Sequence, residues 1–247
     1  MSSGTRRKPL EKIVMDDVIV LGNAVPDFIS NNRTSICTAG YSPTHGLIRI
    51  YPVPINSEMH RWNIVEVPLE RNPADTRVES WKIQNSRTGW NRINSQIRLI
   101  GKVKEADRPH ILKSITSSFG VDCVHELNQK KRSLGFVSPT VENYRFVERD
   151  DYQPPNQTLY GGTAFLTIKN YRYQPRIRYR CSNCESKRAH DQQSVEWGVY
   201  EWMRKNPNKK DEVWKILGLT GRSENPKFLI GNQKLHRTSF LVITVFH

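Results

Sequence analysis

The order of apolar and polar residues in the first hundred positions is that of half-buried β-strands. TSICTAGY and LIRIYPVP are two β-rich runs separated by the turn-like residues 42–46, and together they predict a hairpin. The runs RWNIVEVPLE, DTRVESWKIQ and QIRLIGKVK continue the β pattern. We therefore expect a sheet over residues 33–104.

The spacing of apolar residues becomes helical after Arg108 and predicts two short helices between residues 108 and 127. Further along, TAFLTIKNYRYQPRIRYRC predicts two strands, two more helices follow it, and the apolar C-terminal run predicts a closing hairpin. The fold class we expect is α+β, with a mixed or antiparallel sheet, several short helices and a smaller C-terminal module that carries a C-x-x-C motif.

The polar stretch DDYQPPNQTLYGG is the best candidate for an internal linker, because its prolines and glycines disfavour a continuous helix or strand. We therefore divide the chain into three parts. They are a flexible basic arm at residues 1–14, an α+β core at 15–150 that carries the candidate active site, and a basic C-x-x-C module at 151–247 that packs on the core.

The charge balance points to a polyanionic partner. Lys and Arg number 38 against 24 Asp and Glu, so the formal net charge is +14 and the sequence pI about 9.8. Nucleic acid is the commonest partner of such a chain. No stretch has the ~20 apolar residues of a membrane helix, and the start MSSGTRRKPLEK lacks the apolar core of a signal peptide. We therefore expect a cytoplasmic protein with no membrane partner and with reduced cysteines.

The segment IKNYRYQPRIRYR interleaves arginines with tyrosines. Arginines neutralise phosphates, and tyrosine rings stack on exposed bases. In a strand, Arg176, Arg178 and Arg180 would share one face. An exposed strand with ordinary arginines is the alternative. The nucleic-acid contacts expected in this segment are Arg172, Arg176, Arg178, Arg180, Tyr171, Tyr173 and Tyr179.

The C-x-x-C motif is half of a zinc signature, and a zinc ion bound there could be structural or catalytic, with a structural role preferred. Cys181 and Cys184 have the spacing that lets two thiolates reach one metal, and His190 follows six residues later. The fourth ligand is open among Asp191, Glu196 and His236. A knuckle without metal or a redox pair would have the same spacing.

A third candidate site lies in ADTRVESWKI. In an extended strand, Asp75, Arg77, Glu79 and Trp81 would share one face. Carboxylates beside an arginine and an aromatic ring can position water, stabilise a developing cation or bind a metal. A salt-bridged surface strand would show the same pattern. The hairpin adds Arg49 and Tyr51 as phosphate and base contacts, and Cys37 is most simply a small core residue.

Five motifs occur in order between about Ser35 and Phe246: CTAGYSPTHGLIRIYPVP, DTRVES, RSLGFVSP, C-x-x-C with HDQQSVEW, and the closing FLIGN and FLVITVF. They resemble a family of small bacterial and archaeal proteins, largely of unknown function, with the pattern C-T-A-G, then G, then I-R-[IL]-Y-P. The chain is also similar to a phage-defence DNA glycosylase. It departs from the family motif at Val78, where a proline is expected.

The resemblance implies cleavage of an N-glycosidic bond in DNA, which frees a modified base and serves defence against phage. Such chemistry requires extrusion of the base into a pocket. It makes Asp75 or Glu79 the residue that stabilises the oxocarbenium-like transition state or orients water. Phosphate would be held by Arg49 and Arg77, and the base would stack on Tyr51 or Trp81.

Two other functions remain open. A metal-dependent nuclease would use Asp75 and Glu79 as metal ligands, and a non-catalytic protein would read DNA or RNA through a zinc knuckle. DNA is favoured over RNA by the resemblance. The chain has no phosphate-binding glycine loop, no paired H-x-E and P-C-x-x-C signature and no H-E-x-x-H motif, which disfavours nucleotide hydrolysis, zinc deamination and zincin proteolysis.

Overall fold

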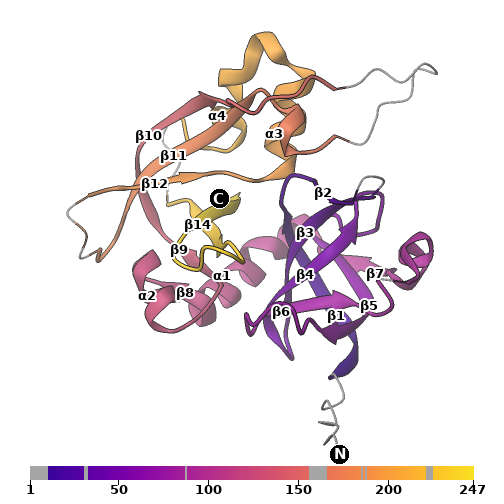
Figure 1. The fold of residues 1–247 in the computed structure, drawn as a ribbon. Helices are drawn as coiled ribbons and strands as arrows, with labels where there is room; N and C mark the ends of the chain where they lie inside the picture. Colours follow the sequence, from indigo (N-terminus) through magenta and orange to yellow (C-terminus); the bar gives the residue numbers. More distant parts are fainter. Residues whose placement is uncertain are drawn as a thin grey trace, which may run out of the picture.

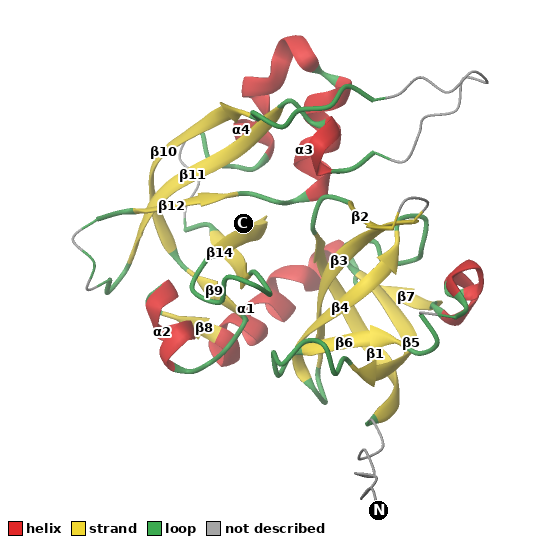
Figure 2. Ribbon diagram, in the orientation of Figure 1, coloured by secondary structure: helices red, strands yellow, loops and turns green. Residues whose placement is uncertain are grey.

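The fold consists of a β-barrel beside a second, mixed α/β part (Figure 1). Strands form most of both parts, and the helices lie around them (Figure 2). No helix among the described residues is long and apolar enough to cross a membrane. The computed structural model describes residues 11–30, 33–86, 88–155, 166–184, 186, 188–220 and 225–247.

Five strands close into the barrel in the order β1-β3-β4-β6-β5, and β5 pairs back onto β1. All these pairs are antiparallel except β4 with β6. Two more strands extend the same sheet, β2 beside β3 and β7 beside β5. The strands are β1 (Lys12–Asn23), β2 (Asp27–Ser30), β3 (Arg33–Ser42), β4 (Gly46–Pro54), β5 (Asn63–Arg71), β6 (Ser80–Ile83) and β7 (Arg98–Lys102).

The barrel has Greek-key topology. Strands β1, β3 and β4 follow one another as antiparallel neighbours, and β5 returns to lie on the other side of β1. Strand β6 then closes the barrel between β5 and β4. A five-stranded Greek-key barrel is the architecture of the OB-fold. Its interior is apolar and includes Val18, Ile50 and Val65, all fully buried.

The second part contains two sheets. One has the order β14-β13-β9-β8 and the other the order β10-β11-β12.

Short 3₁₀ turns occur in both parts, at η1 (Trp90–Arg92), η2 (Asn94–Gln96), η3 (Glu105–Asp107), η4 (Ile168–Asn170) and η5 (Pro207–Glu212). The other elements are α1 (Arg108–Phe119), β8 (Gly120–Val121), α2 (Val124–Gln129), β9 (Leu134–Val137), β10 (Pro139–Glu148), β11 (Tyr173–Cys181), β12 (His190–Gln193), α3 (Trp197–Lys205), α4 (Val213–Ile216), β13 (Lys227–Asn232) and β14 (Phe240–Phe246).

The α+β class predicted from the sequence is confirmed, with strands outweighing helices. The strand pairings, however, cross the division that we expected at residue 150. Strand β9 pairs with β13, and β10 pairs with β11, so segments on both sides of that position share sheets and one apolar core. The expected basic arm at 1–14 overlaps β1 from Lys12, and the rest of it lies outside the described residues.

The barrel and the second part meet where β1 lies against β14. Gly22 faces Thr244 so closely that a Cβ atom on Gly22 would lie 1.9 Å from Thr244 Oγ1. Nearby, Arg61 donates hydrogen bonds to Glu196 at 3.2 Å and to the carbonyl of Val245 at 3.0 Å. Burial raises the pKa of Glu196, and the Arg61 charge opposes this rise. The two parts therefore share a close contact at Gly22 and a partly buried ion pair.

We predict that Gly22→Ala lowers the free energy of unfolding by about 2 kcal/mol or more, because the new methyl group overlaps the Thr244 hydroxyl. Thr244→Ala in the same chain removes that hydroxyl and should restore part of the loss. Urea denaturation of the two single variants and the double variant measures this coupling. Gly101→Ala is the control, since nothing lies within 4 Å of its added Cβ. Additive effects of the two substitutions would contradict the proposed overlap.

Candidate functional site

A cleft of about 600 Å³ lies between the barrel and the hairpin formed by β13 and β14. On the barrel side, Cys37 and Ala39 alternate along β3, and Arg49 and Tyr51 alternate along β4. Alternation places these side chains on the outer face of the barrel, whereas Ile50 between them is buried in the barrel core. The opposite wall includes Gly231, Asn232, Lys234, Leu235, His236 and Ile243.

Two barrel loops complete the cleft. The connection between β1 and β3 contributes Val25 and Asp27, and the connection between β5 and β6 contributes Asp75 and Arg77. The predicted residues Arg49, Tyr51, Asp75 and Arg77 therefore line one cleft. Tyr51 is 36% exposed, and it lines this cleft as well as a second, smaller pocket.

Arg49 is a buried cation in the wall of the cleft. Only 6% of the residue is exposed, and no carboxylate among the described residues forms an ion pair with it. Its Nη2 donates to the carbonyl of Ser133 at 3.1 Å, its Nη1 lies 3.6 Å from the Cys37 thiol, and its Nε has no hydrogen-bond partner. Burial lowers the pKa of Arg49, and the charge of Arg77 adds to this effect while Cys37 opposes it.

Asp75 and Arg77 form a buried ion pair at the edge of the cleft. Arg77 Nη2 and Nε donate to the Asp75 carboxylate at 2.6–3.1 Å, and Ser80 Oγ donates to it at 2.9 Å. Burial opposes ionisation of Asp75, but these hydrogen bonds and the Arg77 charge outweigh it and lower the pKa to about 2. Arg77 also donates to the carbonyl of Asn232 at 2.8 Å. Asp75 is thus an anion at neutral pH.

Glu79 and Trp81 do not share a face with Asp75, contrary to the alternation that we expected. Residues 72–79 form a loop rather than a strand, so period-two spacing does not apply to them. The Glu79 carboxylate accepts hydrogen bonds from the backbone and the hydroxyl of Ser133, at 2.9 and 2.7 Å. Glu79 and Trp81 line a different, smaller pocket. Trp81 is buried there, with the guanidinium of Arg71 stacked 3.7 Å from its ring centre.

The arginines of β11 share a face, as the alternation predicts, but acidic side chains of neighbouring strands pair with them. Glu142 on β10 accepts hydrogen bonds from both Arg178 and Arg180. Asp191 on β12 accepts one from Arg176 at 2.9 Å. Arg172, just before β11, pairs with Glu148. These carboxylates already supply the negative charge that the sequence argument assigned to a nucleic acid.

The tyrosines of this segment lie on the opposite side from the arginines. Tyr179 and Tyr171 are buried in the apolar core, which leaves no ring face for a base. Tyr173 is half-buried and packs against Phe146 and Lys210. The expectation that these three rings stack on bases is therefore not met for Tyr171 and Tyr179.

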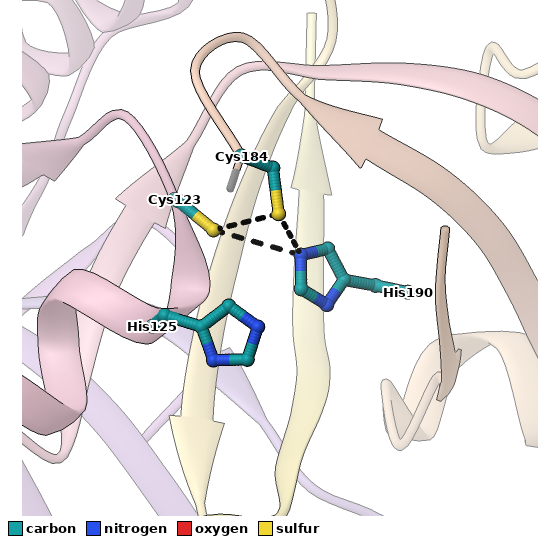
Figure 3. A group of neighbouring side chains, drawn as sticks. All are labelled: Cys123, His125, Cys184 and His190. Atoms are coloured by element: carbon teal, nitrogen blue, oxygen red, sulfur yellow. Dashed lines mark hydrogen bonds between the residues drawn. The ribbon is translucent and has the colours of Figure 1, made fainter. Parts of the chain in front are cut away.

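Four metal-binding side chains meet at the junction of α2, β12 and the loop after β11 (Figure 3). The ligand atoms of Cys123, His125, Cys184 and His190 all lie within 4.8 Å of one another. The two sulfurs are 3.1 Å apart, and His190 Nε2 lies 3.3 and 3.7 Å from them. Tetrahedral zinc with sulfur and nitrogen ligands requires separations of about 3.5–3.8 Å, so small adjustments would admit the ion.

Half of this group could be predicted from the sequence. Cys184 and His190 were predicted, whereas Cys123 and His125 were missed because they lie about sixty residues upstream; their C-x-H spacing was the available signal. Cys181 is not in the group: it is buried in the core, beside Cys123. The fourth ligands that we considered lie elsewhere, since Asp191 pairs with arginines, Glu196 with Arg61, and His236 lines the cleft.

The electrostatics of the cluster favour a cation. Burial raises the pKa of the Cys123 thiol to about 12 and also raises that of Cys181. Burial lowers the pKa of His190, and the neighbouring His125 adds to this effect. A bound metal ion would stabilise the Cys123 thiolate, and two cysteines with two histidines are a donor set typical of structural zinc.

Residues 15–114 match a protein family described as a domain of unknown function, DUF8758. The match covers the barrel strands and the first half of α1, and thus the barrel wall of the cleft with its two loops. The β13–β14 wall and the cysteine–histidine cluster lie outside it. No curated protein matches the chain.

We predict that the purified protein carries one zinc ion per chain, measurable by mass spectrometry of the metal. Cys123→Ser and Cys184→Ser should each lose the ion, because serine is a poor zinc ligand. Both variants should melt at a lower temperature, as should the wild type after chelation. Cys37→Ser is the control outside the cluster, and Cys181→Ser should retain zinc. Loss of zinc from Cys181→Ser with retention in Cys123→Ser would contradict this assignment of ligands.

Proposed function

We propose that this chain is a cytoplasmic DNA-binding protein that takes a single extruded nucleotide into the cleft and excises its base. The observation that carries the proposal is the position of the cleft. In OB-folds, the face of the second and third strands, together with the loops between strands one and two and strands four and five, binds oligonucleotides and oligosaccharides. Here the corresponding elements are β3, β4 and the two loops that line the cleft.

The size and lining of the cleft support a nucleotide as ligand. A cavity of about 600 Å³ is in the range of pockets for small molecules, and an extended strand would need a longer groove. Arg49 offers a cation that lacks a carboxylate partner, which suits a phosphate. The exposed part of the Tyr51 ring offers a surface for stacking. The net charge of +14 favours the approach of a polyanion.

For base excision, we assign an electrostatic role to Asp75. Water adds to C1′ of the sugar, the N-glycosidic bond breaks, and its electron pair leaves with the base, which gains a proton. Positive charge develops on the sugar in the transition state. Asp75 stays ionised at neutral pH, so it can stabilise this charge but cannot donate the proton. Glu79 is not assigned this role because it lines another pocket.

The metal site has a structural role in this proposal. None of its four residues lines the cleft. Bound zinc would cross-link α2 to the loop after β11 and to β12, and base excision would need no added metal. A nuclease that uses Asp75 and Glu79 on one metal ion is disfavoured, because the two carboxylates line different pockets. The role in defence against phage rests on the family resemblance alone.

We expect Tyr51→Ala to weaken binding of single-stranded DNA by about tenfold, which is the usual effect of losing one base–aromatic stack. Fluorescence anisotropy with a labelled oligonucleotide at fixed salt measures the dissociation constant. Tyr152→Ala is the matched control, because Tyr152 is 37% exposed and lies outside the cleft. Equal losses in the two variants would place the binding surface elsewhere.

We expect the wild type to release free base from DNA and leave alkali-labile sites, with or without EDTA. Unmodified DNA and glucosylated-hydroxymethylcytosine phage DNA are the substrates, and mass spectrometry with alkaline gels detects the products. Asp75→Asn should slow release by about 100-fold while it still binds DNA, because the amide cannot stabilise the cationic sugar. Asp211→Asn is the control for an exposed carboxylate outside the cleft.

Each other outcome of this experiment identifies another function. Phosphodiester products that disappear with EDTA would indicate a nuclease. Intact DNA that is only retarded on a native gel would indicate a non-catalytic binder. Tighter binding of RNA than of DNA would indicate that RNA is the ligand. The substitution Asp75→Asn also weakens the pair with Arg77, so thermal melting is needed to test that this variant is folded.

A further inference from the structure

The turn between β13 and β14 presents an apolar side chain at the edge of the cleft. Leu235 is 85% exposed, more than any other large hydrophobic residue that the structure describes, and it lines the cleft. A fully exposed leucine gains free energy when it is buried against a partner. It is also not part of an extended apolar patch, since its neighbours Lys234 and His236 are polar and exposed.

The turn is held in place although its tip is exposed. Asn232 Nδ2 donates to the carbonyl of Arg237 at 2.9 Å, and the amide of Ser239 donates to the carbonyl of His236 at 2.9 Å. Arg237 in turn donates to Thr76 Oγ1 at 2.6 Å, which ties the turn to the barrel loop on the other side of the cleft. Hydrogen bonds within the turn and from Arg237 to Thr76 thus hold the turn that exposes Leu235.

The charges around Leu235 favour a nucleic acid over a protein as its partner. Lys234 precedes it and forms no ion pair with any residue that the structure describes. His236 follows it, and Arg237 lies next in sequence. The turn carries no acidic residue between Asn232 and Phe240. Arg237 already lies 3.8 Å from the Asp75 carboxylate, so Lys234 is the basic side chain that this turn offers to a phosphate. A lysine beside an exposed apolar side chain matches a duplex, where phosphates flank stacked bases.

We propose that Leu235 is a wedge that enters the base stack of duplex DNA and occupies the space left when a nucleotide moves into the cleft. The inference rests on the proposed function, because the extruded nucleotide must have a pocket beside the wedge. Apolar side chains inserted between base steps separate the stacked bases, and burial of the inserted side chain offsets part of the cost of unstacking. Lys234 would hold the phosphate backbone at the point of insertion.

The test compares duplex with single-stranded DNA of the same sequence, using the full chain. A wedge contributes to binding only when the DNA has stacked base pairs that the wedge can separate. Leu235→Ala should therefore weaken duplex binding about tenfold more than it weakens single-strand binding. Duplexes with 2-aminopurine beside the target position report unstacking as a rise in fluorescence, and Leu235→Ala should abolish most of that rise. Leu235→Met, which keeps a long apolar side chain, should retain it.

Leu99→Ala is the matched control, because Leu99 is an exposed leucine on β7, 48% exposed and outside the cleft. Unchanged duplex affinity and fluorescence in Leu235→Ala would overturn the wedge while leaving DNA binding in place. Equal weakening on single strands and duplexes would also overturn it, since the leucine would then be a general contact. Failure of the wild type to bind any DNA would refute the proposed function itself, and the wedge with it.

Discussion

The cleft depends on the contacts of the buried Arg49 guanidinium with Ser133 and Gly231. The guanidinium leaves the barrel from β4, donates to the carbonyl of Ser133 before β9, and packs on Gly231 of β13. A Cβ atom at Gly231 would lie 2.6 Å from Arg49 Nη2, so glycine there allows the barrel and the second sheet to approach. A buried cation without a carboxylate is costly, which indicates that its position serves the cleft more than stability.

The local elements could be predicted from the sequence, whereas the closure of the barrel could not. The hairpin of β3 and β4 and the helices α1 and α2 follow from alternation and helical spacing. Closure depends on β1, which pairs with β5 from Lys12 to Ile19 and with β3 from Ile19 to Asn23, with a register shift within each pairing. Such pairings join distant residues and leave no local pattern.

The site residues also fall into those that a local sequence pattern predicts and those that only the tertiary fold brings together. Arg49 and Tyr51 were predictable because they alternate on a true strand, and Asp75 with Arg77 because oppositely charged residues stand close together. The expectation for Glu79 failed because it lies in a loop, where a single turn reverses the direction of a side chain. Cys123 was missed because its partner Cys184 is distant in sequence. Contacts formed only by the tertiary fold account for each of these differences.

The two walls of the cleft come from different parts of the chain, and this bears on what the barrel can do alone. The match to DUF8758 includes the wall with Arg49 and Tyr51 but not the β13–β14 hairpin. Without the hairpin, the same barrel face would be open, and open OB faces accommodate an extended strand. The hairpin closes that face to a cleft of about 600 Å³ and adds Leu235 to its lining. On the proposed function, therefore, the barrel supplies affinity for the strand, and the hairpin selects a nucleotide that has left the stack.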